Sequence, residues 1–344
     1  MSTIFPEDSW QTVDAEAQGW RTDLLKKASH AAAQFGSISA VVVHKGQVVA
    51  GVGRFDEKVL IRSMRKSFLS ALFGIEVERG RIELDATMQD LAIDDVDGLS
   101  HTEKQATVRQ LLQARSGIYH PALAESKEMR AAKLPRGSKE PGSHWLYNNW
   151  DFNALGTIYE QATGHSVFEG VYRDIAVPIG MEDFQASDGA YLKGERSIHP
   201  AYHMKMTARD LARFGWLYLN RGNWNGQQVI PENWVHESLA AHSFDGTNGY
   251  GYMWWTTGHQ GEAQNPKPSV YRKHLPPFRY FAHGHYGQMI AVMPERGVVI
   301  SHLAQSIERA PEQMAKLWEF VSLIMEAHTG VPSAQNSCRP SKNS

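Results

Sequence analysis

The chain has 344 residues, of which 42% are hydrophobic and 21% are charged, and its formal net charge is −2 at pH 7. A chain of this length can bury a large core, either in two domains or in one domain with a big insertion. The nearly balanced charge gives no reason to expect nucleic acid or an anionic membrane as a partner.

Cysteine content and hydropathy indicate the cellular compartment of the protein. The single cysteine, Cys338, lies in a polar tail, so the sequence contains no disulfide framework. The first residues, MSTIFPEDSWQ, lack the basic and then apolar profile of a signal peptide, and no run approaches about 18 apolar residues. We therefore expect a cytoplasmic protein with no membrane span; a signal peptide ahead of the printed start is the alternative.

The first quarter of the chain predicts a helix, a hairpin and a second, buried helix. Residues 14–34 have the pattern of an amphipathic helix that ends near Gly36. The segment SISAVVVHKGQVVAGVG predicts a β-hairpin that turns at Lys45-Gly46. The segment SMRKSFLSALFGIEVERG, from Ser63 to Gly80, is apolar on more than one side of a helical wheel. Such a helix belongs in the centre of a protein.

The rest of the chain predicts further helices and then strands. Apolar periodicity, with a capping residue or a terminal glycine, predicts helices at residues 107–117, 151–164 and 207–222. Another helix begins at Pro231. Strand patterns return in YGYMWWT, FAHGHYGQMIAVMP and GVVISHL, before a terminal helix in APEQMAKLWEFVSLIMEA.

This order of elements predicts an α/β (α+β) fold, with a central antiparallel sheet flanked by N- and C-terminal helices. Strand patterns lie near both ends of the chain, so we expect the two ends to build one sheet and the middle to be an insertion. The expected domains are a sheet-containing one at 1–85 and 195–330 and a mostly helical inserted one at 86–194. The polar residues 331–344 are predicted to be a disordered tail.

Ser63 and Lys66, at the start of the buried helix, are the first candidate catalytic pair. They stand one helical turn apart, so their side chains project from one face with Cβ atoms roughly 5–6 Å apart. Burial disfavours the charged form of a lysine, and a neutral amine beside a hydroxyl is a general base beside a nucleophile. The alternative is an N-cap serine followed by a solvated lysine.

A second candidate lies in PGSHWLYNNWDFNALG, just ahead of a predicted helix. Tyr147 and Asn149 are two residues apart on a loop, so both can point into one cleft. The phenol could then exchange protons and the amide could position a substrate by hydrogen bonds. The alternative is that Asn149 or Asp151 caps the helix and Tyr147 fills the core.

A third candidate is the segment 281–288, FAHGHYGQ. Glycines inside a strand mark places where a ligand or another backbone comes close. A strand edge with small residues can aim a backbone N–H group at a developing oxyanion. The alternative is a tight bend where the strand begins.

Other segments complete a pattern with these three. VRQLLQARSGIYH is similar to an LL-x-H-T-SG segment, although Ala114 and Arg115 differ from the usual pair, and PGSHWLYNNWDFNALG is similar to a P-G-x-x-F-x-Y-S-N element. MTARDLARFGWLYLNRGNWNGQQVIPENWV and YGYMWW match two further signatures. In this order, over the chain to about residue 330, the motifs resemble the serine β-lactamase and penicillin-recognising family, nearest its class C-related esterase and amide-hydrolase branch.

The resemblance implies a role for each candidate residue. Ser63 would be acylated, and Lys66 and Tyr147 would share proton transfer to the leaving group and later from water. Asn149 would contact the ester or amide group of the substrate. The backbone N–H groups of Ser63 and His285 would form the oxyanion hole. The remaining candidate positions for substrate binding are His283, Gly284, Gly287 and Gln288.

The third motif departs from the family pattern. β-Lactam-directed members carry a lysine there to hold the substrate carboxylate, whereas AHGHYGQ contains none. His283 or His285 occupies that neighbourhood, as in esterase-like members, and either could face the cleft. The resemblance therefore implies a serine hydrolase that acts through an acyl-enzyme on an ester of a small molecule, without a cofactor. A β-lactamase, or a D-amino-acid peptidase or amide hydrolase of the same fold, is the alternative.

Two alternatives belong to other functional classes. A metal-dependent hydrolase could use His199 and His203 together with His283 and His285, but Pro200 disrupts a helical His-x-x-x-His arrangement and sixteen histidines make chance spacings common. A non-catalytic binding module of the same fold would be marked by loss of the nucleophile, the lysine or the tyrosine, and all three are present.

Overall fold

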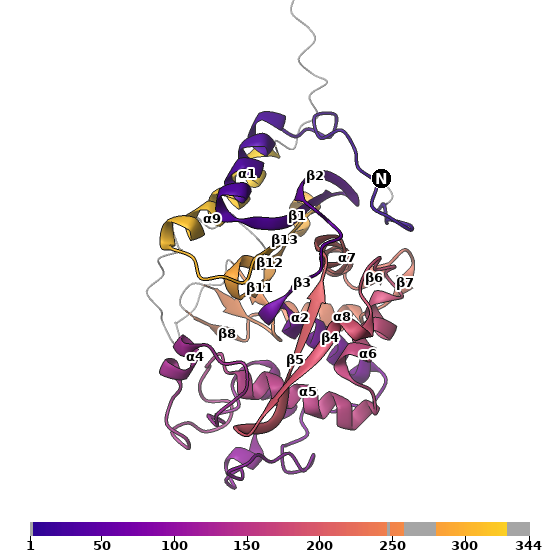
Figure 1. The fold of residues 1–344 in the computed structure, drawn as a ribbon. Coiled ribbons are helices and arrows are strands. Elements are labelled where there is room, and N and C mark those ends of the chain that lie inside the picture. Colours follow the sequence, from indigo (N-terminus) through magenta and orange to yellow (C-terminus); the bar gives the residue numbers. More distant parts are fainter. Residues whose placement is uncertain (1–2, 246–247, 258–279, 329–344) are drawn as a thin grey trace, which may run out of the picture.

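The two ends of the chain meet in one antiparallel sheet (Figure 1), as the sequence predicted. The computed structural model describes residues 3–245, 248–257 and 280–328, and the predicted tail at 331–344 lies outside them. The sheet has eight strands in the order β2-β1-β13-β12-β11-β10-β9-β8. Their bounds are β1 Ser37–His44, β2 Gln47–Gly53, β8 Ser243–Phe244, β9 Gly249–Tyr250, β10 Trp255–Thr256, β11 Tyr280–Gly284, β12 Gln288–Met293 and β13 Val298–Ala304.

Helices cover both faces of this sheet. The terminal helices α1 and α9 pack on one face and on each other, whereas α7 packs against β1, β12 and β13 on the other face (Figure 1). The predicted antiparallel sheet with flanking N- and C-terminal helices is therefore confirmed. The helix bounds are α1 Thr22–Phe35, α2 Arg65–Glu78, α3 Val108–Leu112, α4 Lys127–Ala132, α5 Asn149–Thr163, α6 Val167–Val171, α7 Ala208–Leu219, α8 Glu232–Leu239 and α9 Pro311–Ala327.

The first helix begins later than the sequence predicted. The backbone N–H groups of Gly19 and Trp20 donate to Glu16 and Ala15, and Gly19 adopts a φ of 79°. A residue with positive φ ends any regular helix. Residues 14–21 therefore form turns, and α1 starts only at Thr22.

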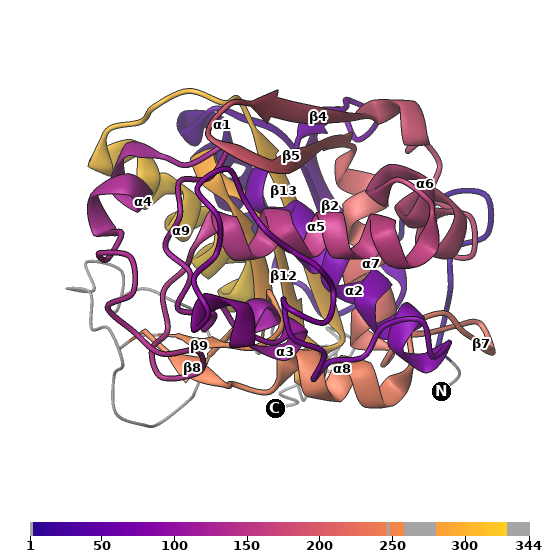
Figure 2. The ribbon, with the colours of Figure 1, turned by 90° about the horizontal axis from the view of Figure 1, so that it is seen from below.

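A second, smaller sheet was not predicted. It pairs β3 (Val59–Leu60), β5 (Ser197–Met206) and β4 (Gly189–Gly194) in the order β3-β5-β4, and a short hairpin of β6 (Asn223–Trp224) and β7 (Gln227–Gln228) follows α7. In β5, buried and more exposed positions alternate only imperfectly, so its strand pattern in the sequence is weak. Strand β5 packs on α5 (Figure 2), and Met204 accepts a hydrogen bond from the backbone N–H group of Ile61.

Helix α2 lies in the middle of the molecule, as its apolar sequence predicted. Every residue from Arg65 to Glu76 is buried. The ring of Phe68 stacks on Phe214 of α7 with centroids 3.8 Å apart, and α5, α6 and α8 also contact α2. Ser63 lies directly before this helix, so the buried helix holds the Ser63 side chain on a rigid support. In the described part of the chain, no helix combines the length and the apolar character that a bilayer crossing requires.

Candidate active site

The segment that carries Ser63 is a tight turn pressed against the large sheet. Arg62–Met64 forms a single 3-10 turn that leads directly into α2, and Arg62 has a φ of 54°, which is rare for a residue with a side chain. Gly284, at the end of β11, lies so close that a Cβ atom there would stand 2.5 Å from the carbonyl oxygen of Ile61. The glycine of the third motif thus lets the turn that carries Ser63 and strand β11 meet.

We expect Gly284→Ala to impair activity through this contact. The added methyl group must push Ile61 and Arg62 away from β11, because it overlaps backbone rather than a flexible side chain. Overpacking of this kind costs about 1–3 kcal/mol of stability. Thermal unfolding and ester turnover should fall together, and because Gly284 has a φ of −117°, the contact rather than the backbone conformation sets the cost. Wild-type turnover in Gly284→Ala would contradict this account.

The structure brings Ser63, Lys66 and Tyr147 together. The Nζ atom of Lys66 donates hydrogen bonds to Ser63 Oγ at 3.0 Å and to Tyr147 Oη at 2.6 Å. Lys66 comes from the first turn of α2, whereas Tyr147 comes from the loop before α5. This geometry is that of a nucleophile within reach of a general base.

The surroundings of Lys66 favour the neutral amine. Its side chain is only 2% exposed, and its Nζ atom lies 4.4 Å and 4.6 Å from the ring centres of Tyr147 and Phe152. Burial, and after it the charge of Arg65, holds the pKa of Lys66 well below that of a free lysine. Burial also raises the pKa of Tyr147, so its phenol stays protonated. The pair therefore offers a base and a proton carrier side by side.

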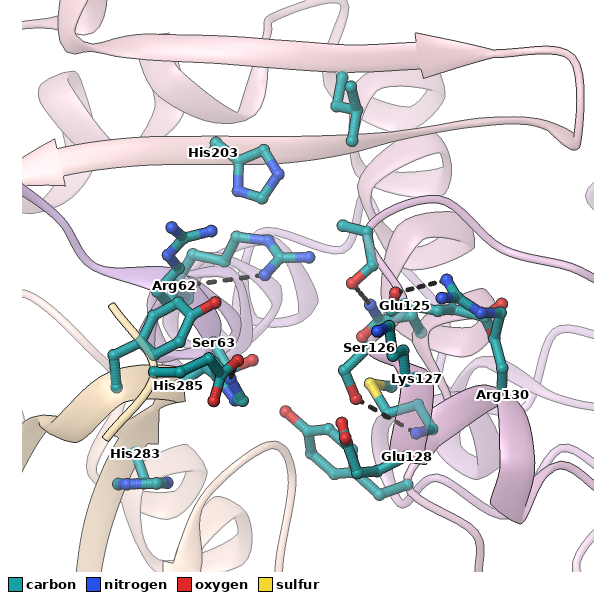
Figure 3. Close-up of a pocket in the computed structure, with 18 of the residues that line it drawn as sticks. Arg62, Ser63, Glu125, Ser126, Lys127, Glu128, Arg130, His203, His283 and His285 are labelled. Carbon is teal, nitrogen blue, oxygen red and sulfur yellow. Dashed lines mark hydrogen bonds and ion pairs between the residues drawn. The ribbon is translucent and has the colours of Figure 1, made fainter. Parts of the chain in front are cut away.

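An open cleft of about 780 Å³ lies over Ser63. In Figure 3, the histidines of the sheets lie on the Ser63 side of the cleft, and the segment that leads into α4 forms the opposite wall. The lining residues include Arg62, Ser63, Arg65, Glu125, Lys127, Arg130, Tyr147, Asn149, His203, Trp255, His283 and His285. A volume of this order suits a small molecule.

Asn149 lines the cleft rather than capping the helix. The cap of α5 is Asn148, whose Oδ1 accepts from the N–H group of Trp150 at 3.1 Å. The Nδ2 atom of Asn149 donates to the carbonyl oxygen of Ala124 at 2.7 Å, while its buried Oδ1 has no partner. Asn149 therefore anchors the segment around Ala124 in the cleft wall, and its Oδ1 atom remains available as a hydrogen-bond acceptor.

Both candidate histidines of the third motif line the cleft. Burial lowers the pKa of His283 to about 4, so it is neutral at pH 7, and its Nε2 atom has no partner. His285 is half exposed, with Nε2 3.7 Å from Glu308. Gly287 and Gln288 do not line the cleft. The side-chain amide of Gln288 donates to the carbonyl oxygen of Ala304 and accepts from its N–H group, and these two bonds join β12 to β13.

The histidines considered for a metal site do not gather. His199 bonds to Thr157 and to the carbonyl oxygen of Asp94, away from the cleft that His203 lines. Among the residues that the structure describes, no group of three or more histidine, cysteine or acidic side chains could hold a metal ion.

Sequence reasoning missed the charged side chains of the cleft. Arg62 directly precedes Ser63, and Arg65 occupies a position that the S-x-x-K motif leaves open. His203 was considered only as a metal ligand, and residues 124–130 carried no motif. The sequence did contain one signal, the two arginines close to Ser63, because charged side chains are rarely buried unless they have partners.

Comparison with known proteins places the chain in a family. Residues 22–319 match the beta-lactamase family, and the chain belongs to that family. This confirms the resemblance drawn from the motifs. A search of curated proteins finds no significant match.

Solved structures show the same fold at low identity. A Bacillus anthracis protein described as a 6-aminohexanoate-dimer hydrolase has a TM-score of 0.64 at 22% identity, over 94% of this chain and 88% of its own. A penicillin-binding protein homolog from Caulobacter crescentus has a TM-score of 0.64 at 15% identity, over 93% and 99%. A class C beta-lactamase has a TM-score of 0.62 at 16% identity, over 88% and 95%.

Proposed function

We propose that the protein is a serine hydrolase that cleaves an ester of a small molecule through an acyl-enzyme on Ser63. The observation that carries the proposal is the buried Lys66 amine, which bonds to both Ser63 Oγ and Tyr147 Oη. A non-catalytic module would have no use for a desolvated lysine in this position, because burying it costs free energy.

The proposed reaction has two halves. Neutral Lys66 takes the proton of Ser63 as Oγ attacks the ester carbonyl, and the proton passes through Tyr147 to the departing alkoxide. Water then gives a proton back to the Lys66–Tyr147 pair and attacks the acyl-enzyme, which releases the acid and restores Ser63. The backbone N–H groups of Ser63 and His285 hold the oxyanion, and Asn149 positions the substrate.

Esters are proposed rather than β-lactams because of the third motif. A β-lactam carboxylate needs a fixed cation beside β11, and His283, which stands there, is neutral at pH 7. Losing a charge-assisted hydrogen bond costs roughly 1.5–3 kcal/mol, or about one to two decades in specificity. Amide hydrolysis is the second candidate, because one structural neighbour is described as a 6-aminohexanoate-dimer hydrolase.

We expect clear turnover of 4-nitrophenyl butyrate and weak or absent hydrolysis of benzylpenicillin. Rates should be compared as kcat/KM at pH 7, with Ser63→Ala as the background for both substrates. An anilide of the same acyl chain tests the amide alternative. Efficient penicillin cleavage with poor ester turnover would reverse this ranking.

A further inference from the structure

Arg65 is a buried cation that has no counter-charge among the residues that the structure describes. It lies between Ser63 and Lys66, is 2% exposed, and contributes to the wall of the cleft. Its Nη1 atom donates a long bond of 3.4 Å to the carbonyl oxygen of Arg62, whereas its Nε and Nη2 atoms are buried and have no hydrogen-bond partner in the described part of the chain. The guanidinium carbon stands 5.0 Å from the ring centre of Tyr202.

Arg62 adds a second positive charge on the same wall. Its Nε atom donates to Ser306 Oγ at 3.3 Å, and its guanidinium lies 5.2 Å from the ring centre of Tyr286. Within the described ranges, no carboxylate forms an ion pair with Arg62 or Arg65 at 4.0 Å or less. The acidic side chains of the cleft lie elsewhere: Glu125 pairs with Lys133, and Glu128 and Glu308 are exposed.

Another buried arginine, Arg213, has the partners that Arg65 lacks. Arg213, which is fully buried, pairs with Glu182 at 3.4 Å and donates to the carbonyl oxygens of Pro6, Glu7 and Ile179. A buried guanidinium that keeps its charge without such partners costs several kcal/mol. An anion brought by the substrate would supply the compensation that Arg65 lacks.

The potential around Arg65 is correspondingly positive. His203 of β5 lines the cleft near both arginines, and burial together with the charges of Arg65 and Arg62 lowers its pKa to about 4. Figure 3 shows His203 and His283 on opposite sides of Ser63. The Arg65 guanidinium therefore faces Tyr202 of β5, whereas the Arg62 guanidinium lies against Tyr286, which follows β11.

We propose that Arg65, assisted by Arg62, forms a subsite that binds a carboxylate of the substrate beside Ser63. A guanidinium forms charge-assisted hydrogen bonds with a carboxylate, and these are stronger than hydrogen bonds between neutral groups. This inference rests on the proposed function, because it names the class of ester that the same site hydrolyses: one with a carboxylate on its acyl or its alcohol side.

Paired substrates test the subsite. On the acyl side, 4-nitrophenyl hydrogen adipate is compared with 4-nitrophenyl hexanoate; on the alcohol side, 4-(hexanoyloxy)benzoate is compared with phenyl hexanoate. The readout is the ratio of kcat/KM for the charged over the neutral ester, after subtraction of the Ser63→Ala background. Because both esters of a pair share the acyl-transfer step, a change in the basicity of Lys66 cancels in this ratio.

We expect the wild-type ratio to exceed one for at least one pair, and Arg65→Met to lower it roughly ten- to a hundredfold. Arg130→Gln is the matched control, because it removes an exposed charge from the opposite wall and should change the ratio less than about fivefold. Wild-type ratios at or below one for both pairs, or equal ratios in the wild type and Arg65→Met, would overturn the subsite. If Arg65→Met does not fold, Arg62→Gln provides the same comparison.

Binding separates this inference from the proposed function. Calorimetry with Ser63→Ala should show adipate binding that neutral adipamide does not match and that Arg65→Met abolishes. If no ester is turned over but adipate binds in this way, the subsite stands and the esterase proposal falls. If esters are turned over without any preference for charge and adipate does not bind, the reverse holds.

Discussion

Ser63→Ala should abolish covalent labelling by a serine-directed phosphonate and reduce ester turnover by on the order of 10⁴–10⁶-fold. The reason is local: Ser63 Oγ is the hydroxyl that the Lys66 amine touches, at 3.0 Å, and it opens onto the cleft. Intact mass before and after the reagent gives the stoichiometry, and peptide mapping gives the site. The fold should survive, because the change removes one partly buried oxygen.

Ser126 is the control for this experiment. It also lines the cleft, but its Oγ accepts a hydrogen bond from the N–H group of Met129 as the cap of α4, and its neighbour is the exposed Glu128 carboxylate rather than a buried lysine. Ser126→Ala should therefore be labelled at Ser63 as fully as the wild type. A label that persists in Ser63→Ala, or that maps to Ser126, would remove Ser63 from the role of nucleophile.

The sequence predicted the parts of the fold whose patterns are local. The hairpin of β1 and β2 has short runs of valine on either side of a turn at Lys45-Gly46, and α2 is apolar on more than one side, so both follow from local sequence patterns. Strand patterns near both ends of the chain predicted that the two ends build one sheet, and the structure shows that they meet where β1 pairs with β13. Strands β4 and β5 were missed because their burial depends on α5 and on the turn at Ile61, which are distant in sequence.

The sequence could predict contacts within one motif of the candidate site, but not contacts between segments that are distant in the chain. The spacing of Ser63 and Lys66 on one helix determines their contact, but the approach of Tyr147 depends on how the loop before α5 packs. That no carboxylate of the described residues pairs with Arg65 is a property of the folded surroundings, and the sequence carries no signal of it. The same holds for Gln288, whose amide turns to Ala304 rather than to the cleft.

Lys66→Met should lower ester turnover by on the order of 10²–10⁴-fold, the usual contribution of a positioned acid–base group. The two side chains are similar in length, and an apolar thioether fits among the rings of Tyr147 and Phe152 that surround the amine. The loss should therefore appear in kcat rather than as unfolding, and thermal unfolding of the variant checks this.

The pH dependence of kcat/KM tests the role of Lys66 as the base more directly than the rate at a single pH. Only the neutral amine can accept the proton of Ser63, so wild-type kcat/KM should be low at acid pH and rise as pH passes through the apparent pKa of the base. That pKa should lie well below the value of a free lysine, because burial and the charge of Arg65 both disfavour the ammonium. It belongs to the coupled Lys66–Tyr147 pair rather than to either group alone.

In Lys66→Met, the rising limb of the pH profile should disappear together with the rate. Lys127→Met is the matched control: Lys127 is an exposed lysine that lines the same cleft, and its removal should cost less than about fivefold and leave the limb in place. Tyr147→Phe should keep a base but lose the proton carrier, and so remain slower than wild type at every pH. Near-wild-type turnover in Lys66→Met, or an unchanged rising limb, would mean that some other group takes the proton from Ser63.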